Sequence, residues 1–365
     1  MSILSQTFRF SFQKKYRRWR LLLALWCVMG LLCYMSVWIP PRDFWPASLV
    51  SYAIPGVWLV NFLLALTLLF VRLKFVLYPV AMMMIGTPFI QETFAYNSPL
   101  PSTTEELSIL SYNVKQFRKP HGYDSFSTAL IQSVVADATE VKCFQEYSTN
   151  PKWEALDVTG QMEKQGYHGC TFAAKIRGND HNPGMAIFSK SPILNSGQVW
   201  NSPRSKNGGL FVDIAPIKDT IRIYNVHLAS MHIDLQQYKK TGHYGQKILY
   251  LLQALKNGAV NRSGQIDALV THTQNCPYPF VIVGDFNDTP YSYNYHRLKH
   301  HYTNAFEAVG SGFGFSFNSL LFFLRIDHHF TGNGLKARSF AVDRSMRISD
   351  HFPTRAHYAL PKHTD

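Results

Sequence analysis

The fold of this chain is decided by the stretch Phe280-Val281-Ile282-Val283-Gly284-Asp285-Phe286-Asn287-Asp288-Thr289-Pro290. Its first four residues are apolar and mostly β-branched, which predicts a strand buried on both faces. The glycine and the turn residues that follow predict that this strand ends at Asp285. Asp285 and Asn287 are two residues apart, so both side chains project from the same side of the strand's end.

Two interpretations of this strand end stand at this point. In a hydrolytic site, one of the two groups holds a metal or orients a nucleophilic water, and the other binds a developing oxyanion. In a purely structural role, Asp285 and Asn287 form an Asx-type turn that closes the strand. These residues alone do not separate the two, so the rest of the chain has to decide between them.

The net charge of +13 is unevenly distributed along the 365 residues. Residues 1–100 contain nine Lys or Arg and two acidic residues, and all 15 histidines lie after residue 100. A basic chain suggests nucleic-acid binding. Because over half of the excess charge lies beside apolar segments, membrane topology explains it better. The five cysteines have no CxxC or metal-ligand spacing, which predicts buried thiols.

Three uncharged, mostly apolar segments near the N-terminus have about the length of membrane helices. They are residues 21–41, 44–71 and 75–91. We interpret residues 1–93 as an all-α membrane anchor of about three helices, with spans at about 21–41, 45–71 and 75–91. A signal peptide has a shorter apolar core. Two prolines interrupt the third segment, so a buried or interfacial segment stays open as its alternative.

The basic residues also predict the orientation of these spans. Six Lys or Arg precede the first segment, and Arg72 and Lys74 lie between the second and the third. The positive-inside rule puts both regions in the cytoplasm. Three spans then place the remaining chain on the outer side of the membrane, whereas a third segment that does not cross leaves it in the cytoplasm.

After a polar linker, interpreted as residues 94–106, the chain reads as a soluble domain over residues 107–361. Strands are predicted at 107–116, 141–147, 170–175, 184–189, 209–214, 221–227, 280–285, 339–342 and 354–358. Helices are predicted at 125–137 and 245–272, the second with Ile248, Leu251, Leu252 and Leu255 on one face. This mixture of strands and helices favours an α+β sandwich over strict βαβ alternation.

Several apolar runs end in polar residues, as the opening stretch does. One run ends at Asn113, one at Glu146 and one at His227. Two further runs end at Asp327 and at the pair Asp350-His351. If these strands share sheets with their ends aligned, all of these side chains converge with those of the opening stretch at one mouth.

Each of these residues also has a simple structural explanation. Glu146 can be a solvated strand end, His227 a core histidine, and Asp327 a partner of Arg325. Only their convergence argues for a site. The converging set is Asn113, Glu146, His227, Asp285, Asn287, Asp327, Asp350 and His351.

Short motifs around these residues occur in a fixed order. This ordered series resembles the endonuclease/exonuclease/phosphatase family, which has the fold of deoxyribonuclease I, and it covers nearly all of residues 107–360. No single motif is specific, but the series is. The motifs are Ser-Tyr-Asn-Val (111–114), Phe-Gln-Glu (144–146), Gly-Met-Ala-Ile-Phe-Ser-Lys (184–190), Asn-Val-His-Leu (225–228), Gly-Asp-Phe-Asn (284–287), Arg-Ile-Asp (325–327) and Ser-Asp-His (349–351).

The resemblance implies a four-layered α/β sandwich, a divalent metal (Mg²⁺ or Mn²⁺) and hydrolysis of a phosphate ester, with nucleic acid among the substrates. Glu146 would be the principal metal ligand, assisted by Asn113 and Asp350. Oxygen ligands of this kind suit Mg²⁺. The histidines could instead suggest zinc, but the chain has no HExxH motif or Cys/His cluster.

The resemblance also implies catalytic roles for the remaining positions. His351 would be the general base or the group that stabilises the phosphoryl oxygens, and Asp327 would hold its ring. His227 would contact the scissile phosphate. Asp285 and Asn287 would position the water or the leaving oxygen. A histidine backed by a carboxylate is held in one tautomer and can transfer a proton near neutral pH.

One position departs from the DNA-repair branch of this family. That branch has an acidic residue two positions after the motif asparagine, where this chain has Lys115. The histidine of Asn-Val-His-Leu is also closer to the deoxyribonuclease and phosphatase branches. The turn after Asp285 looks most similar to membrane-anchored bacterial members, which implies a protein of the bacterial inner membrane.

Three hypotheses of function follow. The first is a membrane-anchored, metal-dependent phosphodiesterase or nuclease. The second is a phosphatase or phosphodiesterase that acts on lipid headgroups or small phosphoesters. The third is an inactive protein that binds a phosphorylated ligand. The lipid bilayer is a partner in each, and the oligomeric state stays undetermined. Basic residues that could hold a polyanion, or simply be solvated, are Lys175, Arg177, Lys190, Arg204 and Lys206.

Overall fold

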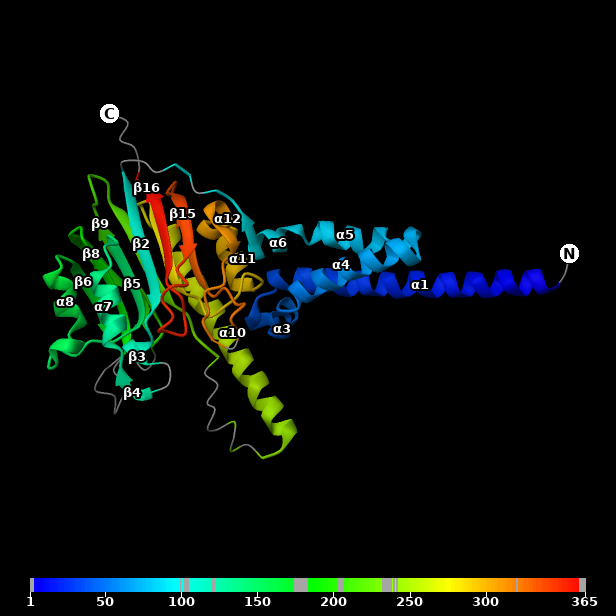
Figure 1. The fold of residues 1–365 in the computed structure, drawn as a ribbon, viewed down its shortest axis with the longest axis horizontal. Coiled ribbons are helices and arrows are strands. Elements are labelled where there is room, and N and C mark those ends of the chain that lie inside the picture. The colour runs from blue at the N-terminus through cyan, green and yellow to red at the C-terminus, as the bar shows by residue number, and fades with distance from the viewer. Residues whose placement is uncertain are drawn as a thin grey trace. The chain divides into compact units, whose positions relative to one another are not determined.

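The computed structural model describes residues 3–98, 100–101, 105–119, 122–173, 183–201, 206–231, 238, 240, 242–319 and 321–360 (Figure 1). Two compact units make up the chain. The first is Met1–Glu92 with Tyr291–Tyr293, and the second is Thr93–Pro290 with Asn294–Asp365. Each unit is described by itself.

The N-terminal unit is helical. Two of its stretches, Arg17–Trp38 and Ile54–Val71, are long and apolar enough to cross a membrane, and Leu73–Ile85 with Thr87–Thr93 forms a pair bent by 53°. Its elements are α1 (Ile3–Met35), η1 (Ser36–Trp38), α2 (Pro41–Phe44), α3 (Pro46–Ser51), α4 (Ile54–Val71), η2 (Leu73–Phe75), α5 (Leu77–Ile85) and α6 (Thr87–Thr93).

Prolines interrupt two of the segments predicted as spans. The span predicted at 45–71 is divided into α3 and α4, and a proline lies in the first turn of each helix. Proline lacks the N–H that a continuing helix needs, so a new helix begins there. The span predicted at 75–91 is likewise bent between α5 and α6, where Gly86 caps α5 and Pro88 follows.

The second unit contains two six-stranded sheets. One has the strand order β12-β14-β11-β10-β9-β8, and the other has the order β15-β16-β2-β5-β7-β6. The strands are β2 (Glu106–Asn113), β5 (Val141–Tyr147), β6 (His168–Ala173), β7 (Gly184–Ser189), β8 (Ile193–Asn201), β9 (Gly208–Ile214), β10 (Ile221–His227), β11 (Phe280–Asp285), β12 (Thr303–Asn304), β14 (Asp327–Gly332), β15 (Lys336–Val342) and β16 (Thr354–Ala359).

Two short ladders and several helices complete this unit. The ladders pair β1 (Phe94–Tyr96) with β13 (Ser311–Phe313), and β3 (Arg118–Lys119) with β4 (Gly122–Phe126). Strand β1 lies within the segment interpreted as a linker. The helices are η3 (Lys115–Phe117), α7 (Thr128–Ala136), η4 (Glu154–Leu156), α8 (Val158–Lys164), α10 (Tyr244–Gln274), α11 (Tyr293–Lys299) and α12 (Ala305–Val309).

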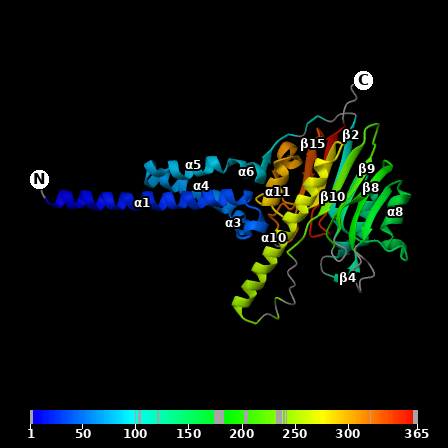
Figure 2. The same ribbon diagram turned by 180° about the vertical axis from the view of Figure 1, so that it is seen from behind.

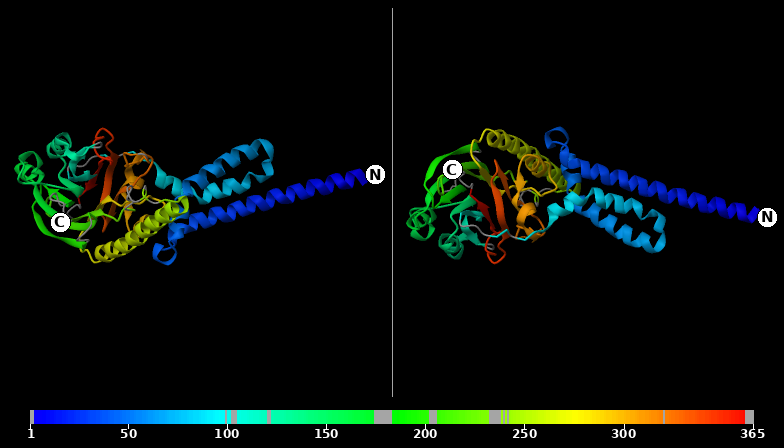
Figure 3. Two further views of the ribbon diagram at one scale, coloured as in Figure 1. Left: turned by 90° about the horizontal axis from the view of Figure 1, so that it is seen from below. Right: turned by 90° about the horizontal axis from the view of Figure 1, so that it is seen from above.

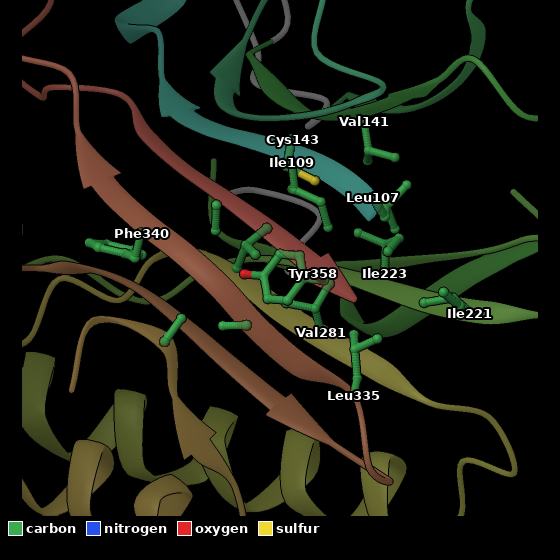
Figure 4. Packing of buried hydrophobic residues seen from close by; sticks show 14 of the residues in the cluster. Leu107, Ile109, Val141, Cys143, Ile221, Ile223, Val281, Leu335, Phe340 and Tyr358 are labelled. Atoms are coloured by element: carbon green, nitrogen blue, oxygen red, sulfur yellow. The ribbon is translucent and has the colours of Figure 1, made fainter. Parts of the chain in front are cut away.

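The two sheets pack face to face because successive strand residues alternate between two apolar layers. Ile109 and Val281 lie in the cluster between the sheets (Figure 4). Leu110 belongs to the outer cluster that α7 and α8 cover. Ile282 belongs to the opposite outer cluster, which α10 and α11 cover. The expected sandwich of two sheets with helices outside is therefore the one observed (Figures 2 and 3).

Four strands have their predicted bounds, namely β5, β7, β10 and β11. Strands β8 and β14 were not predicted. The apolar face predicted around Ile248 is not part of the core, because the buried residues of α10 begin at Gly258. Ile248 is 40% exposed and Leu249 is 67% exposed, and this N-terminal half of α10 projects away from the sheets (Figures 1 and 2).

Candidate active site

Strand directions bring the polar ends of several strands to one edge of the sandwich. In one sheet, β10 and β11 run parallel, so His227 lies opposite Asp285. Strand β14 runs antiparallel to β11, so its first residue, Asp327, is also opposite Asp285. Asp327 was predicted to end a strand and instead begins one. The antiparallel direction nevertheless places it at the predicted edge.

Asp285 is the centre of this arrangement. Its carboxylate is 1% exposed and accepts a hydrogen bond of 2.9 Å from the side-chain amide of Asn113, which belongs to the other sheet. The backbone N–H of Asn287 donates to the second carboxylate oxygen at 2.8 Å. Imidazole nitrogens lie nearby, with Nε2 of His227 at 3.5 Å and Nε2 of His351 at 3.6 Å. Both sheets and both histidines therefore meet at one carboxylate.

His351 and Asp327 form a buried pair beside Asp285. Nδ1 of His351 lies 2.9 Å from Oδ2 of Asp327. Burial alone lowers the pKa of His351, but the carboxylates of Asp327 and Asp285 outweigh burial and raise it. Ser316 Oγ accepts the backbone N–H of Asp327 at 3.1 Å and so fixes the start of β14. This geometry leaves Nε2 of His351 facing Asp285.

The contacts of Asp327 and Arg325 bear on the alternative explanation that these two residues pair with each other. Its 2.9 Å contact is with His351, while the Arg325 guanidinium group lies 3.0 Å from Nδ1 of His328 and donates to the Tyr295 hydroxyl at 3.1 Å. The adjacent histidines of β14 face opposite ways, as expected for a strand, because His329 contacts Tyr358 while His328 contacts the backbone oxygen of residue 288.

The three predicted metal ligands lie at the same edge. Oε2 of Glu146 is 2.6 Å from Nζ of Lys206, and Oδ2 of Asp350 is 2.8 Å from Nζ of Lys115. Burial raises the pKa of each carboxyl group, but the neighbouring cations outweigh it and hold both pKa values below their usual range. Asn113 accepts the backbone N–H of Lys115 at 3.1 Å.

These residues fit a hard divalent cation by their donor chemistry. Two carboxylates and an amide offer oxygen ligands, which Mg²⁺ and Mn²⁺ take. Each carboxylate already holds a cationic group, which shows that the site attracts positive charge. Among the described residues, the group of three acidic or imidazole side chains whose ligand atoms all lie within 4.8 Å of one another is Asp285, Asp327 and His351, and it does not include Glu146 or Asp350. Asp327 and His351 already bond to each other.

His227 and Asn287 occupy defined positions beside Asp285. His227 is 2% exposed, and its Nδ1 lies 3.2 Å from the backbone oxygen of Lys206. Asn287 has a positive φ of 49°, as does Glu146 with 48°. Few residues other than glycine adopt this left-handed backbone, and asparagine tolerates it best. At both places, the turn after β11 and the end of β5, a strained backbone conformation therefore sets the direction of a polar side chain.

A buried amide network next to the site was not predicted. The Gln145 side chain donates to the amide oxygen of Asn225 at 2.7 Å and to the hydroxyl of Ser111 at 3.1 Å. The Asn225 amide donates to the backbone oxygens of Phe144 and Ala186. Gln145 and Asn225 lie inside two of the quoted motifs, so their polarity within an apolar run was the available signal.

The basic residues give a mixed outcome. Lys206 lies in the site, because its ammonium group contacts the carboxylate of Glu146. Lys190 does not, because it follows the end of β7 that pairs with the start of β5, opposite the edge of the site. Its ammonium group lies 4.1 Å from the centre of the Tyr167 ring. Lys175, Arg177 and Arg204 are outside the described residues.

Comparisons with known proteins identify a family for most of the chain. Residues 110–351 match the endonuclease/exonuclease/phosphatase family, and residues 17–93 match a domain of unknown function (DUF8431). No curated protein matches the chain.

Solved structures show similarity at low sequence identity. The endonuclease/exonuclease/phosphatase from Beutenbergia cavernae has a TM-score of 0.53 and 16% identity, over 70% of this chain and 72% of that one. The human Nocturnin catalytic domain with bound sulfate has a TM-score of 0.48 and 14% identity, over 70% and 94%. The Neisseria 3′ phosphatase NExo, bound to product DNA hairpin, has a TM-score of 0.48 and 16% identity, over 68% and 98%.

The Beutenbergia structure supports the fold. The family match covers more than half of the chain and includes all eight residues of the predicted site, from Asn113 to His351. The chain therefore belongs to the endonuclease/exonuclease/phosphatase family, whose members are generally phosphoester hydrolases.

Proposed function

We propose that this protein is a membrane-anchored, divalent-metal-dependent hydrolase of phosphate esters. The observation that carries the proposal is the convergence on Asp285, where Asn113 from one sheet meets His227 and the Asp327–His351 pair from the other. A buried carboxylate among two imidazoles and an amide is an arrangement for holding a water and a phosphate oxygen together, and an Asx turn alone would not need it.

The metal would be held by Glu146, Asp350 and Asn113. When bound, it would neutralise phosphate charge and polarise a phosphoryl oxygen. The oxygen ligands, with no cysteine among them, favour Mg²⁺ or Mn²⁺ over zinc.

The remaining catalytic roles belong to side chains of the protein itself. Asp285 accepts hydrogen bonds on both oxygens, and with Asn287 it orients the attacking water or the leaving oxygen. Asp327 fixes the proton of His351 on Nδ1, so that Nε2 points into the site. Two roles were considered for His351, general base and stabiliser of the phosphoryl oxygens. Its raised pKa favours the second role, in which the cationic imidazole stabilises the phosphoryl oxygens. His227 contacts the phosphate from the neighbouring strand.

The anchor is supported by the two apolar helical stretches and the bent pair of the N-terminal unit. With three crossings, the Lys and Arg distribution puts the catalytic unit on the outer side of a bacterial inner membrane. A reporter fused after residue 100 tests this orientation. Reporter activity found only in the cytoplasm would overturn it.

Hydrolysis is tested with the full-length chain in detergent and a chromogenic phosphodiester, with Mg²⁺ or Mn²⁺ added. We expect turnover that chelation abolishes, and we expect Glu146→Ala and Asp285→Ala each to lower it by orders of magnitude. The matched control is Glu163→Ala, which removes the same carboxylate from helix α8. Near-wild-type turnover of Asp285→Ala would remove the site assignment.

A further inference from the structure

A segment beside the site carries apolar side chains that the fold does not bury. The chain from Gly310 to Leu324 has no charged residue. Within it, Leu321 is 46% exposed, Phe322 is 66% exposed and Phe323 is 51% exposed. We call these three residues the apolar tip. Single exposed apolar residues are common, but three in sequence form a contiguous patch, which marks an interaction surface.

The base of this segment is closed by backbone hydrogen bonds. The N–H groups of Ser316 and Phe317 both donate to the backbone oxygen of Leu324, at 3.0 and 3.1 Å. The N–H of Leu324 in turn donates to the oxygen of Leu321 at 3.0 Å. The apolar tip is therefore presented by a closed turn with a defined base.

The same segment is fastened to catalytic residues. Phe317 forms a β-bridge with His351, and its ring lies edge-on to the imidazole with 5.3 Å between the centres. The N–H of Asn318 donates to the backbone oxygen of Asp350 at 2.7 Å, and the Ser316 hydroxyl accepts the N–H of Asp327. The apolar tip thus has a fixed position relative to the proposed metal ligand Asp350 and the His351–Asp327 pair.

Two exposed arginines lie beside this segment. The Arg344 guanidinium group donates to the backbone oxygens of Phe313 and Phe315, at 2.6 and 3.2 Å, and Arg347 donates to the backbone oxygen of Arg344. Guanidinium groups next to exposed aromatic and aliphatic side chains match the boundary of a lipid layer, where phosphate headgroups lie above acyl chains. A protein partner would not account for the apolar helices of the same chain, whereas a bilayer accounts for both.

We propose that the apolar tip docks on the surface of the bilayer and that the site beside it hydrolyses a phosphoester of a membrane lipid. This inference rests on the proposed phosphoester hydrolysis and names its substrate class. In the reaction, a water oxygen bonds to phosphorus, the bond from phosphorus to one ester oxygen breaks, and the departing oxygen takes up a proton. The tip would hold the catalytic edge at headgroup depth, so the lipid would not have to leave the bilayer.

The test uses the full-length chain reconstituted into phosphatidylcholine vesicles with 20 mol% of an anionic phospholipid. Two activities are compared with Mg²⁺ or Mn²⁺ present: release of headgroup phosphoester from the vesicle lipids, and hydrolysis of a water-soluble chromogenic phosphodiester. The variant is Phe322→Ser/Phe323→Ser. The control is Leu249→Ser, which removes an apolar side chain of similar exposure, 67%, from helix α10.

We expect the double variant to lose at least tenfold of its rate on the vesicle lipid and to keep its rate on the soluble diester within twofold. The control should keep both rates. An unchanged lipid rate in the double variant overturns the inference. So does a wild-type protein that hydrolyses the soluble diester or DNA but no vesicle lipid, although phosphoester hydrolysis itself then stands.

A second readout does not depend on activity. A Phe322→Cys variant labelled with an environment-sensitive fluorophore should show a blue shift in vesicles and quenching by lipids with nitroxide-labelled acyl chains. Labelled wild-type protein provides the background from the native cysteines, which are all free. A solvent-like emission overturns the docking. If the fluorophore reports lipid contact but no substrate is hydrolysed, the proposed function fails, and with it the substrate assignment.

Discussion

Asp327→Asn is the substitution that most directly tests the arrangement around His351. The carboxylate of Asp327 lies 2.9 Å from Nδ1 of His351, and the two side chains are 1% and 5% exposed. Asparagine has the same shape, but it presents an N–H or a neutral oxygen in place of the anion. If its N–H faces Nδ1, that nitrogen must accept the hydrogen bond, so the imidazole is neutral and carries its proton on Nε2, toward Asp285.

The size of the effect follows from the type of bond that is lost. A buried hydrogen bond to a charged group contributes ~1.5–3 kcal/mol, which corresponds to roughly 10- to 100-fold in rate at ~1.4 kcal/mol per tenfold. Removing the imidazole itself with His351→Ala also removes its direct stabilisation of charge in the transition state, and losing one group that stabilises a developing oxyanion costs about 10²- to 10³-fold. Asp327→Asn should therefore reduce kcat less than His351→Ala does.

The assay measures kcat on a soluble phosphodiester for both single variants and for the double variant. Because Asp327 acts through His351, Asp327→Asn should have almost no further effect in the His351→Ala background. Asp343→Asn is the matched control, since it makes the same chemical change at a carboxylate that pairs with Arg355. Thermal melting checks that each variant is folded. A full additional 10-fold loss in the double variant, or a single variant within twofold of wild type, would refute the reasoning.

Three further predictions concern charged residues other than the His351–Asp327 pair. Lys115→Met should bind Mn²⁺ at least tenfold more tightly than wild type, because the Lys115 ammonium group 2.8 Å from Asp350 competes with the metal. Electron paramagnetic resonance of free Mn²⁺ measures the affinity, and an unchanged affinity would contradict the prediction. Burial raises the pKa of Asp137, but Arg355 at 2.7 Å outweighs burial and lowers it. In thermal melts, the melting temperature of wild type should exceed that of Asp137→Asn by its full amount above about pH 4, and this difference should shrink as the pH falls further. A difference that stays constant with pH would argue against the Asp137–Arg355 ion pair. Burial lowers the pKa of Lys142 to about 8, so the melting temperature of Lys142→Met relative to wild type should fall as pH rises from about 8 to about 10; a flat difference would show that this lysine is not desolvated.

Much of the fold was predictable because its central strands are apolar on both faces. Strands β7 and β11 contain only glycine and apolar residues until their last residues, and apolar residues predominate in β5 and β10, so the bounds of all four can be read from the sequence. Strand β8 is mixed in character, with Leu194 61% exposed, and strand β14 buries polar side chains whose partners come from distant parts of the chain. Neither pattern differs locally from that of a loop.

The convergence of the site's side chains at one edge was predictable from the sequence, and the bonds between them were not. Motif order predicted that Asn113, Asp285 and His351 lie together, on the assumption that the strand ends of the sandwich are aligned at one edge. Lys115 stood out as a departure, but nothing near it in sequence indicates that its ammonium group meets Asp350. Such contacts depend on how two separate sheets are aligned, which is a tertiary property.

The hydrogen bond between Asn113 and Asp285 joins one sheet to the other, as does the bond between Gln145 and Asn225. Neither sheet holds the site on its own. In a refolding experiment, a collapsed intermediate with both sheets formed but not yet in alignment would already have native secondary structure and yet no catalytic centre. The return of turnover would therefore time the last event of folding, the locking of one sheet onto the other, which circular dichroism in the far ultraviolet cannot detect.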